Sequence, residues 1–372
     1  MIKNNPHLKK LLSHSEHQEN HFNRKDFLLF LIQKGMLPYF YRLPTSKRYF
    51  TKNATYTIAY FHHLKHTMQH HTHLLAILQA SQKHHITLLP FKGTSLSFLL
   101  FGSPLQRQTS DIDLLVQKEQ LPLALALLKE ESYEIEAPFH RYSISKLMHY
   151  LTVLTLRHKH SGVIVELHWE LFSYKYAISW QTAPLFQEAY PIQEATLCYK
   201  TLPLTPYLLY LVTHAFKHRF ERLSWLYDID QYLRHLPLEP NKLLQEAKDK
   251  QLTTTLLSTL ALTHHYFQTP LPQILHEKIE HPTIQRMTTL LKHHIEQPQK
   301  TYTPLRHLLF LLPLQEGLFA KIRLLYASVY SLTAEDIKAS PLPSSFFFLY
   351  PLLRPFRLLF ASLKRRVWIW DK

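Results

Sequence analysis

Residues 86–116 read ITLLPFKGTSLSFLLFGSPLQRQTSDIDLLV, and this stretch decides the fold. Its pattern predicts a strand, a tight glycine turn, a short helix, a loop and a second strand. The chain has only five glycines, and two of them, Gly93 and Gly102, bracket the expected helix. Glycine permits a tight turn and lets the backbone approach a ligand closely. We therefore expect the active site in this stretch.

The glycine turn has the features of an anion-binding site. Thr94 and Ser95 can cap the helix that follows, which leaves its first N–H groups and the positive end of its dipole facing an anion such as phosphate. Lys92 adds a positive charge beside Gly93.

Asp111 and Asp113 are two residues apart in the second strand, so they should point to one face, opposite the apolar residues Ile112, Leu114 and Val116. Two carboxylates held this close repel each other, and a hard divalent cation such as Mg²⁺ relieves the repulsion. Acidic residues near the start of a strand also serve turns. The pair by itself leaves both interpretations open.

Residues 163–171, VIVELHWEL, offer a third carboxylate, because their alternation predicts a strand with Glu166 and His168 on one face. If this strand lies beside the one with Asp111 and Asp113, the three acids can hold two Mg²⁺ ions, and His168 can touch substrate or orient a ligand. The alternative for Glu166 is an exposed strand residue opposite a Lys or Arg. The upstream acidic pair favours the metal-ligand interpretation.

Composition sets the outer limits. The 372 residues suffice for two domains. The chain has 43 Lys and Arg residues against 27 Asp and Glu residues, which gives a net charge of +16. Such a surface should attract nucleotides, nucleic acid or acidic lipid. The single cysteine, Cys198, excludes an intramolecular disulfide and any multi-cysteine metal site. The first residues lack the apolar core of a signal peptide, so we expect a cytoplasmic protein.

Apolar spacing predicts helices over residues 8–36 and 54–84, joined by a proline-containing loop. A short helix is expected over 119–130, and strand-like pieces over 133–136 and 146–157. Beyond Pro203 helical periodicity continues to about residue 331, starting with the segment 205–233, and Thr333 with Asp336 marks a capped helix start. The predicted domains are an N-terminal helical region (1–85), a catalytic domain (86–200), a helical domain (201–335) and an aromatic, basic tail (336–372).

Most of the 27 histidines should be neutral and solvent-facing at pH 7. One helical face of segment 54–84 carries His62, His66, His70 and His73. A metal could bind there, but no carboxylate joins the stripe, so a solvated face is the preferred interpretation. His214 and His218 have the spacing of a zinc motif, but Ala215 stands where a metalloprotease has its catalytic Glu. We therefore reject the zinc interpretation.

Taken together, the Lys-Gly turn, Arg107, the D-I-D-L-L-V strand and the E-L-H-W strand resemble the nucleotidyltransferase superfamily, which includes DNA polymerase beta. The chain is most similar to an uncharacterised bacterial branch with Lys-Gly where most members carry Gly-Ser. Lys92, Thr94 or Ser95 would have to replace the usual Ser contact to the triphosphate. A second match follows His214 and a basic cluster: the block R-L-x-W-L-x-D-I, filled here by Arg222, Leu223, Trp225, Leu226, Asp228 and Ile229. The resemblance covers residues 80–235.

The resemblance implies an α+β fold, in which a small mixed-sheet nucleotidyltransferase domain carries an N-terminal helical layer and a C-terminal all-helical domain. It implies catalytic, metal-binding roles for Asp111, Asp113 and Glu166, with two Mg²⁺ ions and Mn²⁺ as the alternative metal. Nucleotide contacts are expected from Lys92, Gly93, Thr94, Ser95, Arg107, His168, His214, Lys217 and Arg219. For Trp225 and Asp228 packing and helix-helix hydrogen bonding are expected instead.

The resemblance implies that the protein is a metal-dependent, ATP-binding nucleotidyltransferase. An acceptor hydroxyl would attack the α-phosphorus of a nucleoside triphosphate, and pyrophosphate would leave. The acceptor stays open among a small molecule, a sugar phosphate and a protein. Nucleic acid is not expected, since the chain has no aromatic-basic ladder of the kind single-strand binders use.

The alternative function is a non-catalytic anion-binding or membrane-surface protein that retains the fold. The tail from residue 340 combines aromatic residues with Arg354, Arg357, Lys364, Arg365 and Arg366. Its prolines and arginines argue against a spanning helix. An interfacial helix in peripheral contact with a membrane and a surface packed onto the helical domain are both open, with packing slightly preferred.

Overall fold

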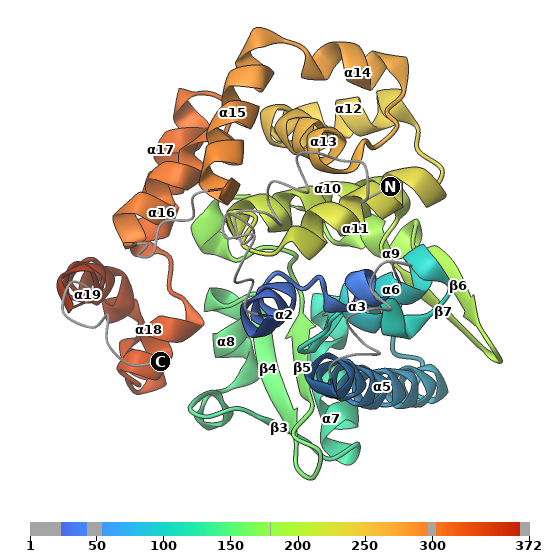
Figure 1. Cartoon of the computed structure of the whole chain (residues 1–372). Coiled ribbons are helices and arrows are strands. Elements are labelled where there is room, and N and C mark those ends of the chain that lie inside the picture. Colours follow the sequence, from blue (N-terminus) through green and yellow to red (C-terminus); the bar gives the residue numbers. More distant parts are fainter. Residues whose placement is uncertain (1–23, 43–53, 179, 297–302, 365–372) are drawn as a thin grey trace. The chain divides into compact units, whose positions relative to one another are not determined.

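The computed structural model describes residues 24–42, 54–178, 180–296 and 303–364 (Figure 1). The chain divides into two compact units, each assembled from three segments. Unit 1 comprises Met1–Ala76, Pro90–Ile112 and Tyr190–Pro298, and unit 2 comprises Ile77–Leu89, Asp113–Ala189 and Gln299–Lys372. Two of the crossings between units fall at the ends of the stretch 90–112. The domain boundaries at residues 85, 200 and 335 remain predictions.

Most of a five-stranded sheet belongs to unit 2, with the order β1-β2-β5-β4-β3. β4 pairs antiparallel with both β5 and β3, so that Thr155 lies opposite Glu166 and Val153 opposite His168. In this order the strand with Glu166 lies beside the strand with Asp113, which is the condition that the sequence analysis set for a shared metal site. The strands are β1 (Leu88–Phe91), β2 (Ile112–Val116), β3 (Tyr133–Ile135), β4 (Val153–His158) and β5 (Ile164–His168).

Burial along these strands differs from the expectation in one respect. In β5 the alternation holds, since Val165 and Leu167 are fully buried while Glu166 is half-buried. In β2 every residue is buried, including Asp113 and Leu115, so the face that carries Asp113 is covered as well as the apolar face. β2 lies inside the sheet between β1 and β5, and residues on both of its faces are covered.

Helices complete unit 2. The helix expected over 119–130 is present as α7, but α8 replaces the first part of the strand expected over 146–157. Thr333 and Asp336 form the expected capping box, with the Thr333 backbone N donating to Asp336 Oδ2 at 2.8 Å. The helices are α7 (Leu121–Glu130), α8 (Ile144–Tyr150), α9 (Ala183–Gln187), α16 (Pro304–Leu311), α17 (Leu318–Tyr330), α18 (Ala334–Ala339) and α19 (Tyr350–Lys364).

Unit 1 is mainly helical and contains the hairpin of β6 (Tyr190–Glu194) and β7 (Leu197–Thr201). α10 packs against α11, α12 and α13. The helices are α2 (Arg24–Gln33), α3 (Leu37–Tyr41), α5 (Ala54–Lys83, whose last turns belong to unit 2), α6 (Gly93–Phe101), α10 (Leu204–Lys217), α11 (Leu223–His235), α12 (Pro240–Asp249), α13 (Thr253–Phe267), α14 (Gln273–Ile279) and α15 (Pro282–Glu296).

Three local predictions in unit 1 were wrong. The expected loop after residue 36 begins with α3, where Pro38 occupies the first turn and its missing N–H costs nothing. The segment 205–233 is two helices, because Arg219 and Phe220 adopt φ values of 58° and 54° that end α10. On α5, His70 of the predicted solvated stripe is buried, whereas His62 and His66 are exposed as predicted. His71, which lies outside that stripe, is also buried, and its Nε2 lies 3.0 Å from Glu194 Oε1.

The α+β class is confirmed, with one mixed sheet, one hairpin and a helical C-terminal region. Among the residues that the structure describes, no helix combines the length and the apolar content needed to cross a bilayer. The expected helix over 8–36 is present from Arg24, and its earlier part lies outside the described residues.

Candidate functional site

Three side chains that could bind a metal meet on the sheet of unit 2. Asp113 comes from β2, and Glu166 and His168 come from the neighbouring strand β5. One ligand atom from each lies within 4.8 Å of the other two. His168 Nε2 is 3.3 Å from Asp113 Oδ1 and 3.4 Å from Glu166 Oε2. Strand alternation explains the pair on β5, because residues two apart share a face.

The imidazole of His168 balances two carboxylates. Burial by itself would lower the pKa of His168, but the neighbouring Asp113 and Glu166 outweigh burial and raise it above its usual value. The three side chains differ in access to solvent: the side chain of Asp113 is 1% exposed, that of His168 10%, and that of Glu166 33%. Glu166 therefore presents the open side of the cluster.

The donor set fits a divalent cation. Two carboxylates and an imidazole are ligands that Mn²⁺ and other first-row metals accept, whereas Mg²⁺ prefers oxygen ligands alone. The predicted set of Asp111, Asp113 and Glu166 thus differs from the observed cluster by one member. Asp111 precedes β2, is half-buried and belongs to unit 1, and its carbonyl accepts a hydrogen bond from Thr109 Oγ1 at 2.9 Å. Its role as a ligand remains a prediction.

The helix after the glycine turn in unit 1 starts two residues earlier than a cap at Thr94 would place it. Lys92 is the N-cap residue of α6, so Thr94 and Ser95 lie buried inside the first turn and do not cap the helix. Lys92 adopts φ 64° and ψ −156°, a region of backbone space that essentially only glycine occupies. Its backbone N donates to Tyr207 Oη at 2.7 Å, which ties the turn to α10. Tyr207 had no signal in the sequence.

Gly93 has a steric reason to be glycine. Its φ is 47°, and an added Cβ would lie 3.1 Å from Thr109 Oγ1 and 3.4 Å from the Asp111 carbonyl oxygen. The absent side chain therefore makes room for the loop before β2. At Gly102, by contrast, an added Cβ would meet nothing within 4 Å.

A cationic cluster surrounds His214, a half-buried residue in the last turn of α10. Burial lowers the pKa of His214 well below its usual value, and the positive charges of Lys92, Lys217 and His218 lower it further. The His214 ring packs edge-on against Trp225, with 5.1 Å between the ring centroids. The structure thus brings together predicted site residues from the glycine turn and from α10.

Arg107 lies at the margin of this cluster, and its charge also lowers the pKa of His214. Its Nε donates to Asp228 Oδ2 at 2.9 Å, and Tyr39 Oη donates to Asp228 Oδ1 at 2.8 Å. Burial by itself would lower the pKa of Arg107, but the Asp228 carboxylate more than offsets burial and raises it. Arg107 is therefore a structural cation with a buried counter-ion, in addition to its predicted nucleotide role.

Arg219, the last of the predicted nucleotide contacts, follows α10 in a left-handed conformation. It forms an ion pair with Glu221. Glu221 also accepts, through its backbone carbonyl, a hydrogen bond from Lys34 Nζ at 3.0 Å. The turn between α10 and α11 is therefore held by charged contacts.

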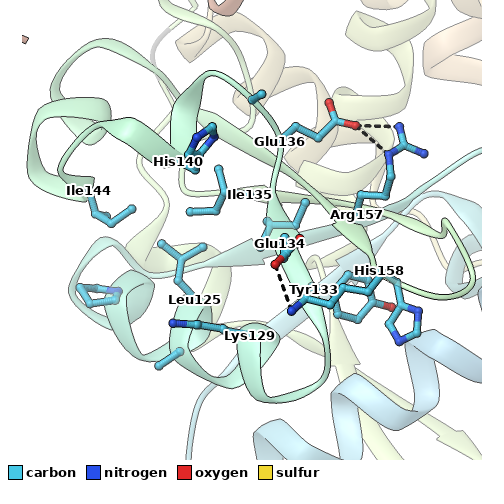
Figure 2. Close-up of a pocket in the computed structure, with 15 residues that line it drawn as sticks. Leu125, Lys129, Tyr133, Glu134, Ile135, Glu136, His140, Ile144, Arg157 and His158 are labelled. Carbon is cyan, nitrogen blue, oxygen red and sulfur yellow. Dashed lines mark hydrogen bonds and ion pairs between the residues drawn. The ribbon is translucent and has the colours of Figure 1, made fainter. Parts of the chain in front are cut away.

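A cavity of about 920 Å³ lies at the β3 edge of the sheet in unit 2 (Figure 2). Arg157 Nη2 donates to Glu136 Oε1 at 2.7 Å, and Lys159 Nζ lies 3.0 Å from Glu134 Oε1. None of the predicted site residues lines this cavity. Because Arg157 and Lys159 already have acidic partners, we assign no role to it.

No curated protein matches the chain. A solved structure, "Crystal structure of an antigenic nucleotidyltransferase-like protein from Paracoccidioides brasiliensis", is similar at 20% sequence identity over 49% of this chain and 88% of that one, with a TM-score of 0.30. The family described as "Uncharacterised nucleotidyltransferase" matches residues 20–268, more than half of the chain. The protein therefore belongs to this nucleotidyltransferase family.

Proposed function

We propose that the protein transfers a nucleoside monophosphate from a nucleoside triphosphate to an acceptor hydroxyl, with release of pyrophosphate, and that the reaction depends on a divalent metal. The observation that carries this proposal is the cluster of Asp113, Glu166 and His168 on two neighbouring strands. Membership of a nucleotidyltransferase family supports the class of reaction.

Asp113, Glu166 and His168 would hold the cation, and Asp111 is the additional ligand that the resemblance implies for two Mg²⁺ ions. When bound, the cation supplies positive charge that compensates the triphosphate and the leaving pyrophosphate. The imidazole in the donor set makes Mn²⁺ an equal candidate.

Glu166 is the member of the cluster that can reach an acceptor. Its side chain is one third exposed, whereas those of Asp113 and His168 are nearly covered. We assign Glu166 to accept the proton of the acceptor hydroxyl, because a general base must lie within hydrogen-bond reach of that proton.

The triphosphate is assigned to the cationic cluster of unit 1. The positive charges of Lys92 and Lys217 lie close enough to His214 to lower its pKa, and two cations gathered at one place favour a polyanion. The unusual backbone of Lys92 adds support, since conformations of this kind cost about 1–3 kcal/mol and collect at ligand-binding sites. Gly93, Thr94, Ser95, Arg107 and Arg219 are the further nucleotide contacts that the resemblance implies. The acceptor is a small molecule, a sugar phosphate or a protein.

Label transfer tests the proposal. The chain is incubated with a cell extract and with each nucleoside triphosphate labelled at the α- or the γ-phosphate, in the presence of Mg²⁺ or Mn²⁺. We expect α-label in an acceptor and γ-label in pyrophosphate. Asp113→Asn and Glu166→Gln should each lower the rate by at least about 100-fold, since charge compensation by the cation contributes several kcal/mol and each 1.36 kcal/mol is tenfold.

Glu134→Gln is the matched control, because Glu134 is an exposed acid on β3 of the same sheet, paired with Lys159 outside the cluster. It should leave the rate unchanged. Transfer of the γ-label to an acceptor would identify phosphoryl transfer instead. Transfer at an undiminished rate in the presence of a chelator would refute the metal dependence.

A further inference from the structure

The C-terminal helices of unit 2 expose large apolar side chains to solvent. On α17 these include Phe319, Ile322 and Tyr326, which are 80%, 53% and 67% exposed. On α19 they include Leu352, Phe356 and Phe360, which are 64%, 63% and 61% exposed. We call the exposed sides of α17 and α19, defined by these six residues, the apolar face. α17 and α19 pack against each other within the unit.

Helical spacing shows that the apolar face is not the side that builds the core. On α17 the residues Ala320, Leu324 and Ala327 are buried, and they lie opposite the exposed arc of Phe319, Ile322 and Tyr326. A helix at the surface of a water-soluble unit has polar residues on its outer side. α17 carries large apolar residues on both sides, with Arg323 exposed among them. This pattern is typical of a helix whose outer side also contacts an apolar environment.

The face is held rigidly by a buried ion-pair network. Asp336 accepts hydrogen bonds from Arg354 and, at its Oδ1, from Arg357 Nε at 2.5 Å. Arg354 Nη2 also donates to the Ser328 carbonyl on α17 at 3.1 Å. These contacts fix α19 against α17 and α18, so the apolar side chains are presented by a preformed surface and need not be exposed by unfolding.

Charge decides which partner the face fits. The sequences of α16, α17 and α19 contain no Asp or Glu, whereas Arg306, Lys321 and Arg323 lie among the apolar residues and Arg306 and Arg323 are exposed. A second copy of the chain would bring like charges together. Anionic lipid complements both features, because its acyl boundary accepts Leu and Phe while its headgroups attract Lys and Arg.

We infer that the apolar face docks onto the surface of an anionic bilayer, with Phe319, Ile322, Phe356 and Phe360 entering the boundary between headgroups and acyl chains. The chain is held at the membrane from one side, since no helix among the described residues can span it. This binding does not require nucleotidyl transfer. It would bring the enzyme close to an acceptor that lies at the membrane surface.

Sedimentation with extruded vesicles tests the inference on the full chain. We expect binding to vesicles of equal parts phosphatidylcholine and phosphatidylglycerol, and much weaker binding to phosphatidylcholine alone. The double substitution Phe319→Ser, Phe356→Ser keeps the net charge and should lower the partition coefficient by about 100-fold, since burying each large side chain contributes at least about a factor of ten. Lys321→Gln should lower the preference for anionic vesicles by about fivefold.

The matched control is Leu290→Ser on α15, because Leu290 is 66% exposed and lies outside the C-terminal helices. It should leave vesicle binding unchanged. The inference is overturned if anionic vesicles fail to sediment the chain, or if the phenylalanine double variant binds them as well as the parent chain does. It is also overturned if that variant only dissociates an oligomer in lipid-free analytical ultracentrifugation. Label transfer without vesicles should be the same in parent and variant, so a failure here leaves the proposed function untouched.

Discussion

The substitution Asp228→Asn is expected to destabilise the protein through the buried guanidinium of Arg107. The side chains of Arg107 and Asp228 are 9% and 1% exposed, so solvent screens their interaction very little. Asn keeps the size of the side chain and an acceptor for the Tyr39 hydroxyl, but it removes the counter-charge. Breaking a buried pair at one partner costs about 3–5 kcal/mol, because the remaining charge stays desolvated.

Urea unfolding followed by circular dichroism and tryptophan fluorescence measures this effect. For a unit of this size each kcal/mol corresponds to about 2–4 °C, so we also expect the melting temperature to fall by about 6–20 °C. Asp249→Asn is the control, because Asp249 is exposed on α12 and its loss should change the free energy of unfolding by less than about 0.5 kcal/mol.

A second substitution separates charge from packing. When Arg107→Met is combined with Asp228→Asn, no buried charge is left unpaired, and much of the lost stability should return. The double-mutant cycle then gives the coupling energy of the pair directly. A loss below about 1 kcal/mol for Asp228→Asn alone, the value of a surface pair, would refute the reasoning.

Three further predictions concern the cationic cluster and its turn. The pKa of His214 is lowered in the folded chain, so the unfolded chain binds a proton at this residue at a higher pH than the folded chain does. The free energy of unfolding should therefore fall as the pH drops below about 6.5. In urea unfolding at a series of pH values, His214→Gln should make this fall less steep, whereas His235→Gln, at the exposed end of α11, should leave it unchanged. Lys92→Gly should raise the free energy of unfolding by about 1 kcal/mol, because glycine adopts the backbone conformation at this position without strain. The same substitution should lower the rate of label transfer, because it removes a positive charge. An unchanged free energy of unfolding would contradict the assignment of strain. Gly93→Ala should cost about 1 kcal/mol more than Gly102→Ala, since both have positive φ but only the first would crowd Thr109; equal melting temperatures would contradict this.

Local patterns in the chain were enough to predict much of the fold. The strand, glycine turn, helix and second strand of residues 86–116 are present, and so are the alternation around Glu166 and the capping box at Thr333. Each of these features depends on the conformational preferences of a few consecutive residues, and such local preferences can be read from the sequence. Spacing alone left the adjacency of β2 and β5 as a condition of the metal site, and the structure meets that condition.

Contacts between distant segments account for what was missed. The sequence placed His168 on the face of Glu166, but only the packing of β5 against β2 brings it 3.3 Å from Asp113. The partnership of Arg107 with Asp228 joins residues 121 positions apart, and the contact of His71 with Glu194 joins α5 to a distant hairpin. No local preference encodes such pairs.

The sequence by itself determined the chemistry available to this protein: its acidic strands, its cationic excess, its glycine turn and its family. The tertiary structure alone decided which of those groups lie together and which of them stabilise the fold instead of forming the candidate site. The physical reason is that a side chain's type is set by the chain, whereas its burial, its pKa and its partners depend on segments that only folding brings within a few ångströms.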